Sequence, residues 1–345
     1  MADLPPEGPP TTKDLAKFAG VSRATVDRVL NGREGVKQKT IDKVNEAIRE
    51  LGFVRNLSAA NLAKNKRYRF VFLLPSRGDL FLKEIQRHIR EAEAVLVNEM
   101  VQVDLECLDE NDPHGIASYL TSLSLGTVDG VAIMAPETPQ VRDAILRLSE
   151  RGVQALSFIS NQPRTGDDWV GIDNEAAGAT AGTLLGRFLG GRGGNVLVVS
   201  ETMKSRDSLE RRHGFDRVLN EGFPNVVVLP SLETYGSAER ARSIIVETVE
   251  RQKIAAVYIL SSEARVPLTV LRDLGLPQPV VTIAHERTPF TEEALRKGYL
   301  DAVIAQDPGH LARSAIRKLK AMTDQRSTLV SQEKIRIEIL IAENL

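Results

Sequence analysis

The sequence predicts a small all-α head followed by an α/β body of two doubly wound lobes. Three observations support this fold class. The chain has 345 residues, which is too many for one small domain. In the first fifty residues, apolar side chains recur at helical spacing. From residue 69 onward, short apolar runs alternate with helical stretches, a pattern typical of parallel sheets covered by helices.

Charge divides the chain at the same place. Residues 1–68 hold thirteen Lys and Arg against eight Asp and Glu, whereas residues 69–345 hold 32 against 38. A basic module on a mildly acidic body is typical of a DNA-binding head attached to another domain.

Composition favours a cytoplasmic protein with no membrane partner. Hydrophobic residues make up 42% of the chain, enough for a sizeable core. The lone Cys107 cannot form an internal disulfide, and no segment resembles a signal peptide or a membrane span. The proline-rich residues 1–10 are expected to form a disordered tail.

The head is predicted to contain three helices. Thr11-Thr12 can cap the first, along which Leu15, Phe18 and Ala19 recur at helical spacing.

The second helix follows a tight turn at Gly20, a residue that takes left-handed backbone without steric cost. Ser22 caps this helix, Asn31-Gly32 ends it, and a third helix runs from about Gln38 to Leu51. The apolar stripe of the second helix comprises Val26, Val29 and Leu30. Two short helices joined by a glycine turn and braced by a third form a helix-turn-helix.

Burying that stripe leaves Arg23, Ala24, Asp27 and Arg28 outward. Arginines in this position can pair with guanine in the major groove or contact phosphates. The alternative is a small helical bundle without a DNA role, and the two exposed arginines favour DNA binding.

The body contains eight apolar runs that we predict to be buried strands. They are FVFLLP (70–75), VQVDLECL (101–108), GVAIMAP (130–136), VQALSFI (153–159), NVLVVS (195–200), NVVVLP (225–230), AAVYIL (255–260) and PVVTIAH (279–285). So many strands over 277 residues indicate two similar lobes rather than one sheet. We expect the first lobe to comprise residues 69–174 and 307–328, and the second to comprise 175–306 and 329–345.

In such sheets, ligands bind outside the carboxyl ends of the strands. Polar residues follow several predicted strands: Ser76-Arg77-Gly78-Asp79, Ser160-Asn161-Gln162-Pro163, Glu201, Ser261-Ser262-Glu263 and Glu286-Arg287. Together they suit a hydroxyl-rich ligand held by directed hydrogen bonds. For each position, the alternative is an ordinary solvated loop residue.

No pattern predicts catalysis, a metal or a cofactor. The run GGRGGN (190–195) ends a helix and enters a strand, which is the reverse of a dinucleotide-binding loop. The five histidines lack metal-ligand spacing, and there is no nucleophile elbow. We therefore expect that the chain is not an enzyme.

The head resembles the lactose/galactose repressor family, whose pattern DVA..AGVS..TVSRVLN is followed by a third helix, an LGY.PN turn and an A..L hinge helix. The counterparts here are Asp14-Leu15-Ala16, Ala19-Gly20-Val21-Ser22, Thr25-Val26-Asp27-Arg28-Val29-Leu30-Asn31, Leu51-Gly52-Phe53-Val54-Arg55-Asn56 and Ser58-Ala59-Ala60-Asn61-Leu62-Ala63. So long a colinear match is highly specific.

The resemblance implies roles for individual residues. Arg23 and Ala24 fall at base-reading positions, and Arg28 falls at a base-contacting arginine. The positions that support the backbone or contact phosphate are Thr12, Ser22, Thr25 and Asn31.

Asp27 departs from the family, which usually has a serine at this position. Its carboxylate can accept from a cytosine amino group. It can equally pair with Arg23 one helical turn earlier and fix the direction of that side chain. We favour the second interpretation, and neither speaks against DNA binding.

Residues 55–66 are polar apart from two leucines and too short for a stable isolated helix, so alone they predict a linker. The resemblance implies a hinge that becomes helical on the operator, one copy per subunit in the minor groove. There Leu62 opens a base step, and the small Ala59 lets the two helices approach. Asn56 precedes the hinge, and we expect it to contact DNA as well.

The body resembles the effector domain of the same family and the periplasmic ribose-type sugar-binding proteins. The matching segments are VGIDNEAAGATAGTLLGRFLGGRGGNVLVV, ERRHGF, TIAHERTP leading to DAVIAQDP, and RIEILIAENL. By position, Arg211 falls at the effector-binding arginine, Glu286 at a hydroxyl-binding carboxylate and Gln306 at the hinge-strand glutamine. Further effector candidates are Arg77, Phe81 (as a stacking aromatic), Asn161 and Ser261. Because Ser261-Ser262 replaces an Asn-Asp pair of the sugar-binding proteins, the effector is expected to differ from theirs.

These observations predict a helix-turn-helix domain over residues 11–54, a hinge or linker over 55–68, and an effector-binding and dimerisation domain over 69–345. The expected function is that of a dimeric, nucleoid-associated repressor of catabolic or transport genes. It would bind a pseudo-palindromic double-stranded operator and sense a small sugar or related polyhydroxylated metabolite. The alternatives are a sugar-binding transport protein and a ligand sensor that does not bind DNA.

Overall fold

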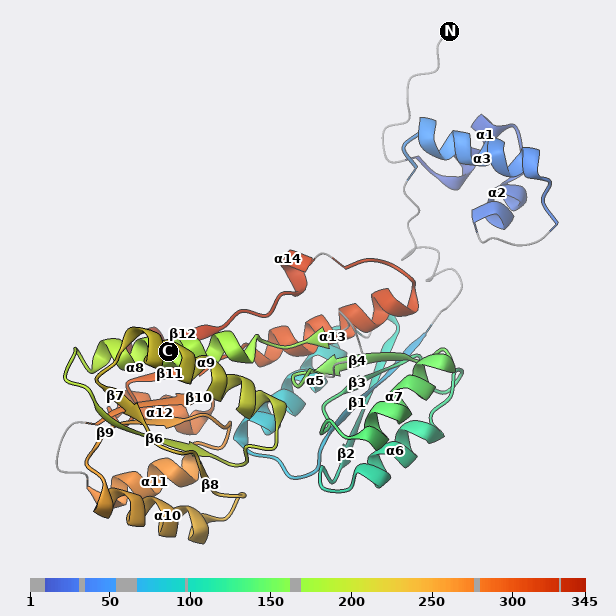
Figure 1. Ribbon diagram of the computed structural model, residues 1–345. Coiled ribbons are helices and arrows are strands. Elements are labelled where there is room, and N and C mark those ends of the chain that lie inside the picture. Colours follow the sequence, from blue (N-terminus) through green and yellow to red (C-terminus); the bar gives the residue numbers. More distant parts are fainter. Residues whose placement is uncertain are drawn as a thin grey trace. The chain divides into compact units, whose positions relative to one another are not determined.

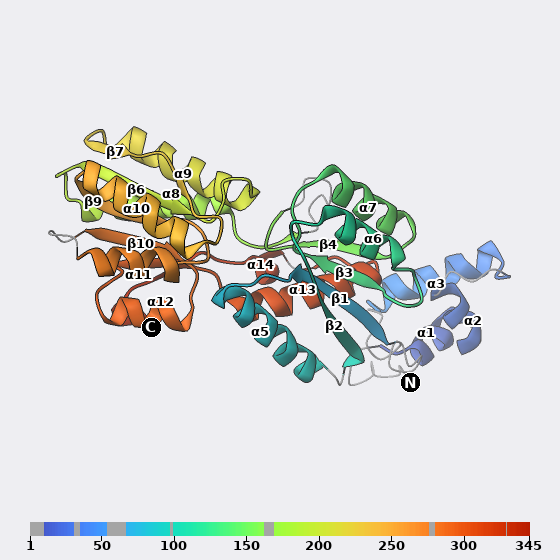
Figure 2. The ribbon, with the colours of Figure 1, turned by 90° about the horizontal axis from the view of Figure 1, so that it is seen from below.

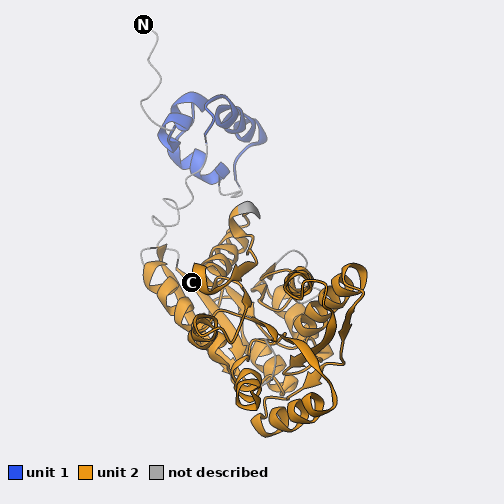
Figure 3. Cartoon of the chain, turned by 90° about the vertical axis from the view of Figure 1, so that its left-hand side faces the viewer, with its two compact units in different colours: residues 1–66 blue, residues 67–345 orange. Residues whose placement is uncertain are grey.

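The computed structural model describes residues 10–30, 35–53, 67–96, 99–161, 169–275, 280–328 and 330–345. Contacts divide the chain into two compact units, residues 1–66 and residues 67–345 (Figure 3). The first unit contains the head and the second is the body. No helix of the described residues is long and apolar enough to cross a membrane.

The head contains α1 (Thr12–Ala19), α2 (Arg23–Leu30) and α3 (Gln38–Glu50), as Figure 1 shows. A capping box starts α1: the Thr11 hydroxyl accepts from the Asp14 N–H at 3.4 Å, and the Asp14 carboxylate accepts from the Thr11 N–H at 2.8 Å. Gly20, with φ 64°, ends the helix in the left-handed region. The buried core of the head comprises Leu15, Ala19, Val26, Val44 and Ala47. The predicted helix-turn-helix is confirmed.

Phe18 shares the helical apolar spacing of Leu15 and Ala19 but lies outside the core of the head. Its surface is 55% exposed. A residue three positions after Leu15 lies about 60° to one side of it, whereas Ala19 lies about 40° to the other. The described part of the head covers the Ala19 side of α1, so Phe18 remains at the surface.

The first lobe of the body is built on a five-stranded sheet in the order β2-β1-β3-β4-β5, with every pairing parallel. The strands are β1 (Tyr68–Pro75), β2 (Val101–Leu108), β3 (Gly130–Ile133), β4 (Gln154–Phe158) and β5 (Trp169–Val170). The helices of this lobe are α5 (Leu80–Leu96), α6 (Pro113–Ser122), α7 (Pro139–Glu150) and α13 (Pro308–Thr323).

Helices cover both faces of this sheet, which explains why its central strands β1 and β3 are nearly continuous apolar runs. The edge strand β2 alternates buried and exposed residues at its start. Phe70 and Phe72 of β1 belong to the cluster that includes side chains of α5 and α13. The alternate residues Val71 and Leu73 point to the opposite face, where α6 and α7 pack.

The second lobe is built on a seven-stranded sheet in the order β12-β11-β10-β9-β6-β7, with β8 also paired to β6. Its strands are β6 (Gly194–Ser200), β7 (Val226–Val228), β8 (Leu232–Glu233), β9 (Ile254–Ile259), β10 (Val281–His285), β11 (Ala302–Ala305) and β12 (Glu338–Leu340). Its helices are α8 (Asn174–Phe188), α9 (Arg206–Gly222), α10 (Ala238–Arg251), α11 (Arg265–Leu274) and α12 (Pro289–Arg296), and α14 (Val330–Glu333) and the 3₁₀ turn η2 (Ala342–Asn344) flank β12. Only the β11–β12 pairing is antiparallel among those described.

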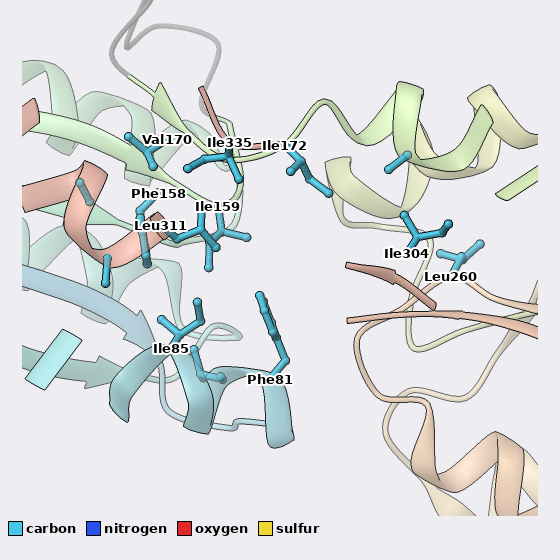
Figure 4. Packing of buried hydrophobic residues seen from close by; sticks show 14 of the residues in the cluster. Phe81, Ile85, Phe158, Ile159, Val170, Ile172, Leu260, Ile304, Leu311 and Ile335 are labelled. Carbon is cyan, nitrogen blue, oxygen red and sulfur yellow. The ribbon is translucent and has the colours of Figure 1, made fainter. Parts of the chain in front are cut away.

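The chain crosses between the lobes after β5, after β11 and again before β12 (Figure 2). The carboxyl ends of the central strands of both sheets face this crossing region. In Figure 4, Phe81 and Ile85 of α5 point toward Ile159 at the end of β4, with Leu260 and Ile304 of the second lobe across from them. The fold thus brings the polar residues that follow each strand to one region of the body.

Candidate functional site

The first candidate site is the exposed face of α2. The Ser22 hydroxyl accepts from the Thr25 N–H at 3.1 Å and lies 2.8 Å from the Thr25 hydroxyl, so it caps the helix as predicted. Val26 is fully buried and fixes the rotation of α2. The side chains left exposed by this rotation are Arg23, Ala24, Asp27 and Arg28.

The remaining predicted DNA contacts lie at the edges of this face or outside the described residues. Thr12 is half-buried at the first position of α1, where unpaired N–H groups and the helix dipole attract phosphate. Asn31, Asn56, Ala59 and Leu62 lie outside the described residues.

The second candidate site is a buried polar network in the body, centred on Arg211 of α9. Only 5% of Arg211 is exposed. Its Nε donates to Asn174 Oδ1 at 2.8 Å, its Nη1 to the Leu260 carbonyl at 3.0 Å and its Nη2 to Glu286 Oε1 at 2.9 Å. One guanidinium therefore links the start of α8 to the carboxyl ends of β9 and β10.

Glu286 joins the network directly after β10. Its backbone has φ 67°, a left-handed conformation that is uncommon for a residue with a side chain. The Glu286 N–H donates to the Ile304 carbonyl at 2.9 Å, and its own carbonyl accepts from the Thr291 hydroxyl at 2.9 Å. These two bonds hold the strained residue in place, a combination that concentrates at functional sites.

Gln306 completes the group from the end of β11. Its Nε2 donates to Glu286 Oε1 at 3.1 Å, so the amide oxygen must point the other way. Glu286 and Gln306 are each 1% exposed, and among the described residues Glu286 Oε2 and Gln306 Oε1 have no hydrogen-bond partner. Burial raises the pKa of Glu286, and Arg211 and Gln306 oppose this rise. A buried network with free acceptor atoms is suited to a ligand that donates hydrogen bonds.

Close contact between α8 and α9 positions Arg211. A Cβ added at Gly178 of α8 would overlap the backbone carbonyl of Arg211. Gly214, one turn further along α9, similarly leaves no room for a Cβ beside the Glu175 carbonyl. Glycine at both positions lets the two helices approach closely, which carries the guanidinium to the ends of the strands.

The structure thus brings together Arg211, Glu286 and Gln306. Ser261 is half-buried and follows Leu260, whose carbonyl binds Arg211. Asn161 follows the left-handed residue Ile159 (φ 62°), and its Oδ1 is buried without a partner among the described residues.

Two of the predicted effector-binding residues, Phe81 and Arg77, lie outside the buried network. Phe81 is only 3% exposed and packs in the hydrophobic cluster of the first lobe, so its ring presents no free face (Figure 4). The Arg77 side chain is 74% exposed and lies 3.8 Å from Asp109. In this structure neither side chain joins the buried network.

Asn174 and Asp207 were not predicted from the sequence as residues of the site. Asn174 binds Arg211, while Asp207 Oδ2 accepts from the Ser160 hydroxyl of the first lobe at 2.7 Å. Asp207 precedes Arg211 by one helical turn, so spacing along the predicted helix was a usable signal. Asn174 lies far from Arg211 in the chain, and only the packing of α8 on α9 brings the two together.

Tyr258 and His285 form a buried polar pair in the second lobe. Tyr258 Oη and His285 Nε2 are 2.7 Å apart, and the Tyr258 ring stacks on Phe215 with centroids 4.2 Å apart. Burial holds the pKa of His285 well below 6.5, with a further lowering from Arg211. The histidine therefore belongs to the core of the second lobe in its neutral form.

Comparison with known proteins agrees with this architecture. Residues 70–327 match the family described as periplasmic binding protein domain, and residues 11–56 match the bacterial regulatory proteins of the lacI family. The chain belongs to the periplasmic-binding-protein domain family and carries a lacI-family head. The transcriptional regulator DegA of Bacillus subtilis is 23% identical over 288 residues, covering 82% of this chain and 83% of DegA. Catabolite control protein A of Priestia megaterium is 27% identical over 288 residues, covering 81% and 82%.

A solved structure shares the fold of the body. An ABC transporter solute-binding protein from Burkholderia graminis, in complex with D-arabinose, aligns with a TM-score of 0.70 at 20% identity, covering 81% of this chain and 96% of that one. The lacI-family head and the matched regulators make this chain a DNA-binding regulatory protein and not an enzyme, as the sequence predicted.

Proposed function

We propose that this lacI-family chain is a ligand-responsive repressor that binds a pseudo-palindromic operator as a homodimer. The single observation that carries the proposal is the buried group of Arg211, Glu286 and Gln306, which holds free acceptor atoms within a body joined to a helix-turn-helix. A regulator of this kind acts in the cytoplasm at the nucleoid. The genes it represses encode catabolic or transport proteins for the metabolite that it senses.

The head reads DNA through α2. Arg23 and Arg28 supply guanidiniums that suit guanine edges, Ala24 makes apolar base contact, and Asp27 either orients Arg23 or accepts from a cytosine amino group. The contacts that support this docking are made by Thr12, Ser22, Thr25, Asn31 and Asn56. The hinge residues Ala59 and Leu62 enter the minor groove at the centre of the operator.

The body binds a small polyhydroxylated metabolite. The fold is shared with a solute-binding protein solved with D-arabinose, and the network offers a guanidinium, a carboxylate and an amide for hydroxyl groups. Asn161 and Ser261 follow β4 and β9 and border the same site, whereas Arg77 and Phe81 lie outside the network in this structure.

Ligand binding is transmitted through lobe closure. Contacts between the lobes include the Ser160–Asp207 hydrogen bond at 2.7 Å and the Arg206–Glu137 ion pair at 3.6 Å. A ligand that shifts these contacts changes the spacing of the two hinges in a dimer. A hundredfold change in operator affinity requires about 2.7 kcal/mol of coupling between the two sites.

The test is selection of a DNA duplex from a random pool, followed by fluorescence anisotropy with the full chain. The proposal predicts sequence-specific, salt-sensitive binding to a two-half-site duplex, and a change in affinity when a metabolite binds the body. Absence of specific binding would favour a transport protein or a ligand sensor without a DNA role.

A further inference from the structure

Carboxylates of both lobes follow the carboxyl ends of strands, as Glu286 does. Asp79 and Glu110 follow β1 and β2 of the first lobe, whereas Glu201 and Glu263 follow β6 and β9 of the second. Burial raises the pKa of Glu201. The carboxylates that raise it further are those of Asp79, Glu110 and Glu263. Glu201, Glu263 and Glu286 follow the neighbouring strands β6, β9 and β10, so they lie at one edge of the second sheet. Asp79 of the first lobe adds to the raised pKa of both Glu201 and Glu286, which indicates that negative charge of the two lobes meets at this edge.

The basic side chains of the body neutralise only part of this charge. Arg211 binds Glu286, and its other two hydrogen bonds go to neutral oxygens. Arg265 lies 3.8 Å from Glu263, with 57% of its side chain exposed. Within the described ranges, three carboxylates of the site form no ion pair: Asp79, Glu110 and Glu201.

The free hydrogen-bonding atoms of the site are acceptors. Glu286 Oε2 and Gln306 Oε1 are buried without partners among the described residues, and the bond from Gln306 Nε2 to Glu286 fixes the amide orientation. Other unpartnered buried oxygens belong to Glu110, Asn161 and Asp207. A ligand that satisfies these atoms must donate hydrogen bonds.

We propose that the effector is a small polyol that carries a protonated amine, the chemistry of amino sugars and amino cyclitols. Its ammonium group binds beside Glu201, and its hydroxyls donate to Glu286 and Gln306. An ammonium donates hydrogen bonds only and neutralises part of the surplus negative charge. A neutral sugar leaves the carboxylates uncompensated, and a phosphorylated or acidic metabolite adds further negative charge. This inference rests on the proposed ligand-sensing function.

The test is calorimetric titration of the full chain with matched pairs of probes. Each amino compound (glucosamine, galactosamine, mannosamine, aminodeoxyinositols) is compared with its hydroxyl analogue and its N-acetyl derivative. At least one amine should bind at least tenfold more tightly than both of its matched compounds.

Charge-neutralising variants locate the ammonium. The Glu201 carboxylate makes no ion pair or hydrogen bond among the described residues, and glutamine has nearly the same shape. Glu201→Gln should therefore fold normally and weaken the amine about tenfold while leaving its hydroxyl analogue unchanged. Glu221→Gln, an exposed carboxylate near the end of α9, is the matched control and should change neither affinity.

Three results overturn the inference: a neutral polyol that binds as tightly as its amine, equal effects of Glu201→Gln and Glu221→Gln, or no binding by any amine of the panel. Operator binding separates these results from failure of the proposed function. If a neutral polyol binds the body and shifts operator affinity, the proposed ligand-responsive function is supported and only the inference of an amine is wrong.

Discussion

Replacing Arg211 with methionine tests the buried network most sharply. The substitution keeps the apolar stem but removes the guanidinium that bonds Asn174, Leu260 and Glu286. Glu286 is 1% exposed and cannot regain water, so its carboxylate must either stay charged without its cation or take up a proton.

The size of the loss follows from these two outcomes. Breaking a buried ion pair costs about 3–5 kcal/mol. Protonation sets an upper limit: from the ordinary pKa of 4.5, it costs about 3.4 kcal/mol at pH 7 and about 1.4 kcal/mol at pH 5.5. A carboxyl with a raised pKa favours the folded state as pH falls. Arg211→Met should therefore lose about 3 kcal/mol at pH 7 and about 2 kcal/mol less than that at pH 5.5.

The assay is urea unfolding at both pH values. The double variant Arg211→Met with Glu286→Gln should recover most of the loss, because no charge is then buried. Arg212→Met is the matched control: Arg212 also joins a carboxylate (Asp216, 2.7 Å), a side-chain oxygen (Ser231) and a backbone carbonyl (Leu229). The Asp216 side chain is 34% exposed and can regain water, so we expect a loss that is the same at both pH values. A loss for Arg211→Met that is below 1 kcal/mol, or equal at both pH values, would show that Arg211 does not compensate the buried charge of Glu286.

Four further substitutions test the helix contact beside Arg211, the buried histidine, the DNA-reading face and the surface of α1. Gly178→Ala should lower the free energy of unfolding by about 1–3 kcal/mol and weaken effector binding, because the new Cβ overlaps the Arg211 backbone. Gly222→Ala, which meets nothing within 4 Å, is its control and should be neutral or stabilising in the same urea titration. His285 is held neutral with a lowered pKa, so the free energy of unfolding should fall as pH drops through 6.5. The part due to this residue is about 1.4 kcal/mol at pH 5.5. The pH dependence of unfolding of His285→Gln should lack this part, and an identical pH dependence would contradict the assignment. Arg28→Ala should weaken anisotropy-measured binding to the selected operator at least tenfold without changing the melting temperature, whereas an unchanged affinity would remove Arg28 from the reading face. Phe18→Ser should change the melting temperature little, since 55% of Phe18 is exposed, and a large drop would indicate burial in solution.

Buried strands were predictable from the sequence because helices cover both faces of each sheet. The run 70–75 lies within β1, and 195–200 lies within β6. The glycine run before β6 was also correctly predicted as a helix stop, with left-handed backbone at Gly190 and Gly191. The two-residue strand β5 is too short to show a pattern, because neighbouring strands rather than its own side chains define it.

The candidate site was only partly predictable. The family resemblance selected Arg211, Glu286 and Gln306, which the structure joins by direct hydrogen bonds. One partner of Arg211 is the Leu260 carbonyl, and a backbone group has no signature in a sequence. Phe81 was chosen as a stacking aromatic, yet packing against the first-lobe core buries it, which depends on contacts distant in the chain.

We propose that a ligand bound at Arg211 controls occupancy of DNA by the head. The most direct measurement is anisotropy of the selected operator titrated with the full chain, with and without a ligand that stabilises the body. We predict that the ligand changes operator affinity at least tenfold in the wild-type chain and by less than twofold in Arg211→Met. If a ligand binds the body while operator affinity stays the same, the body does not control the head.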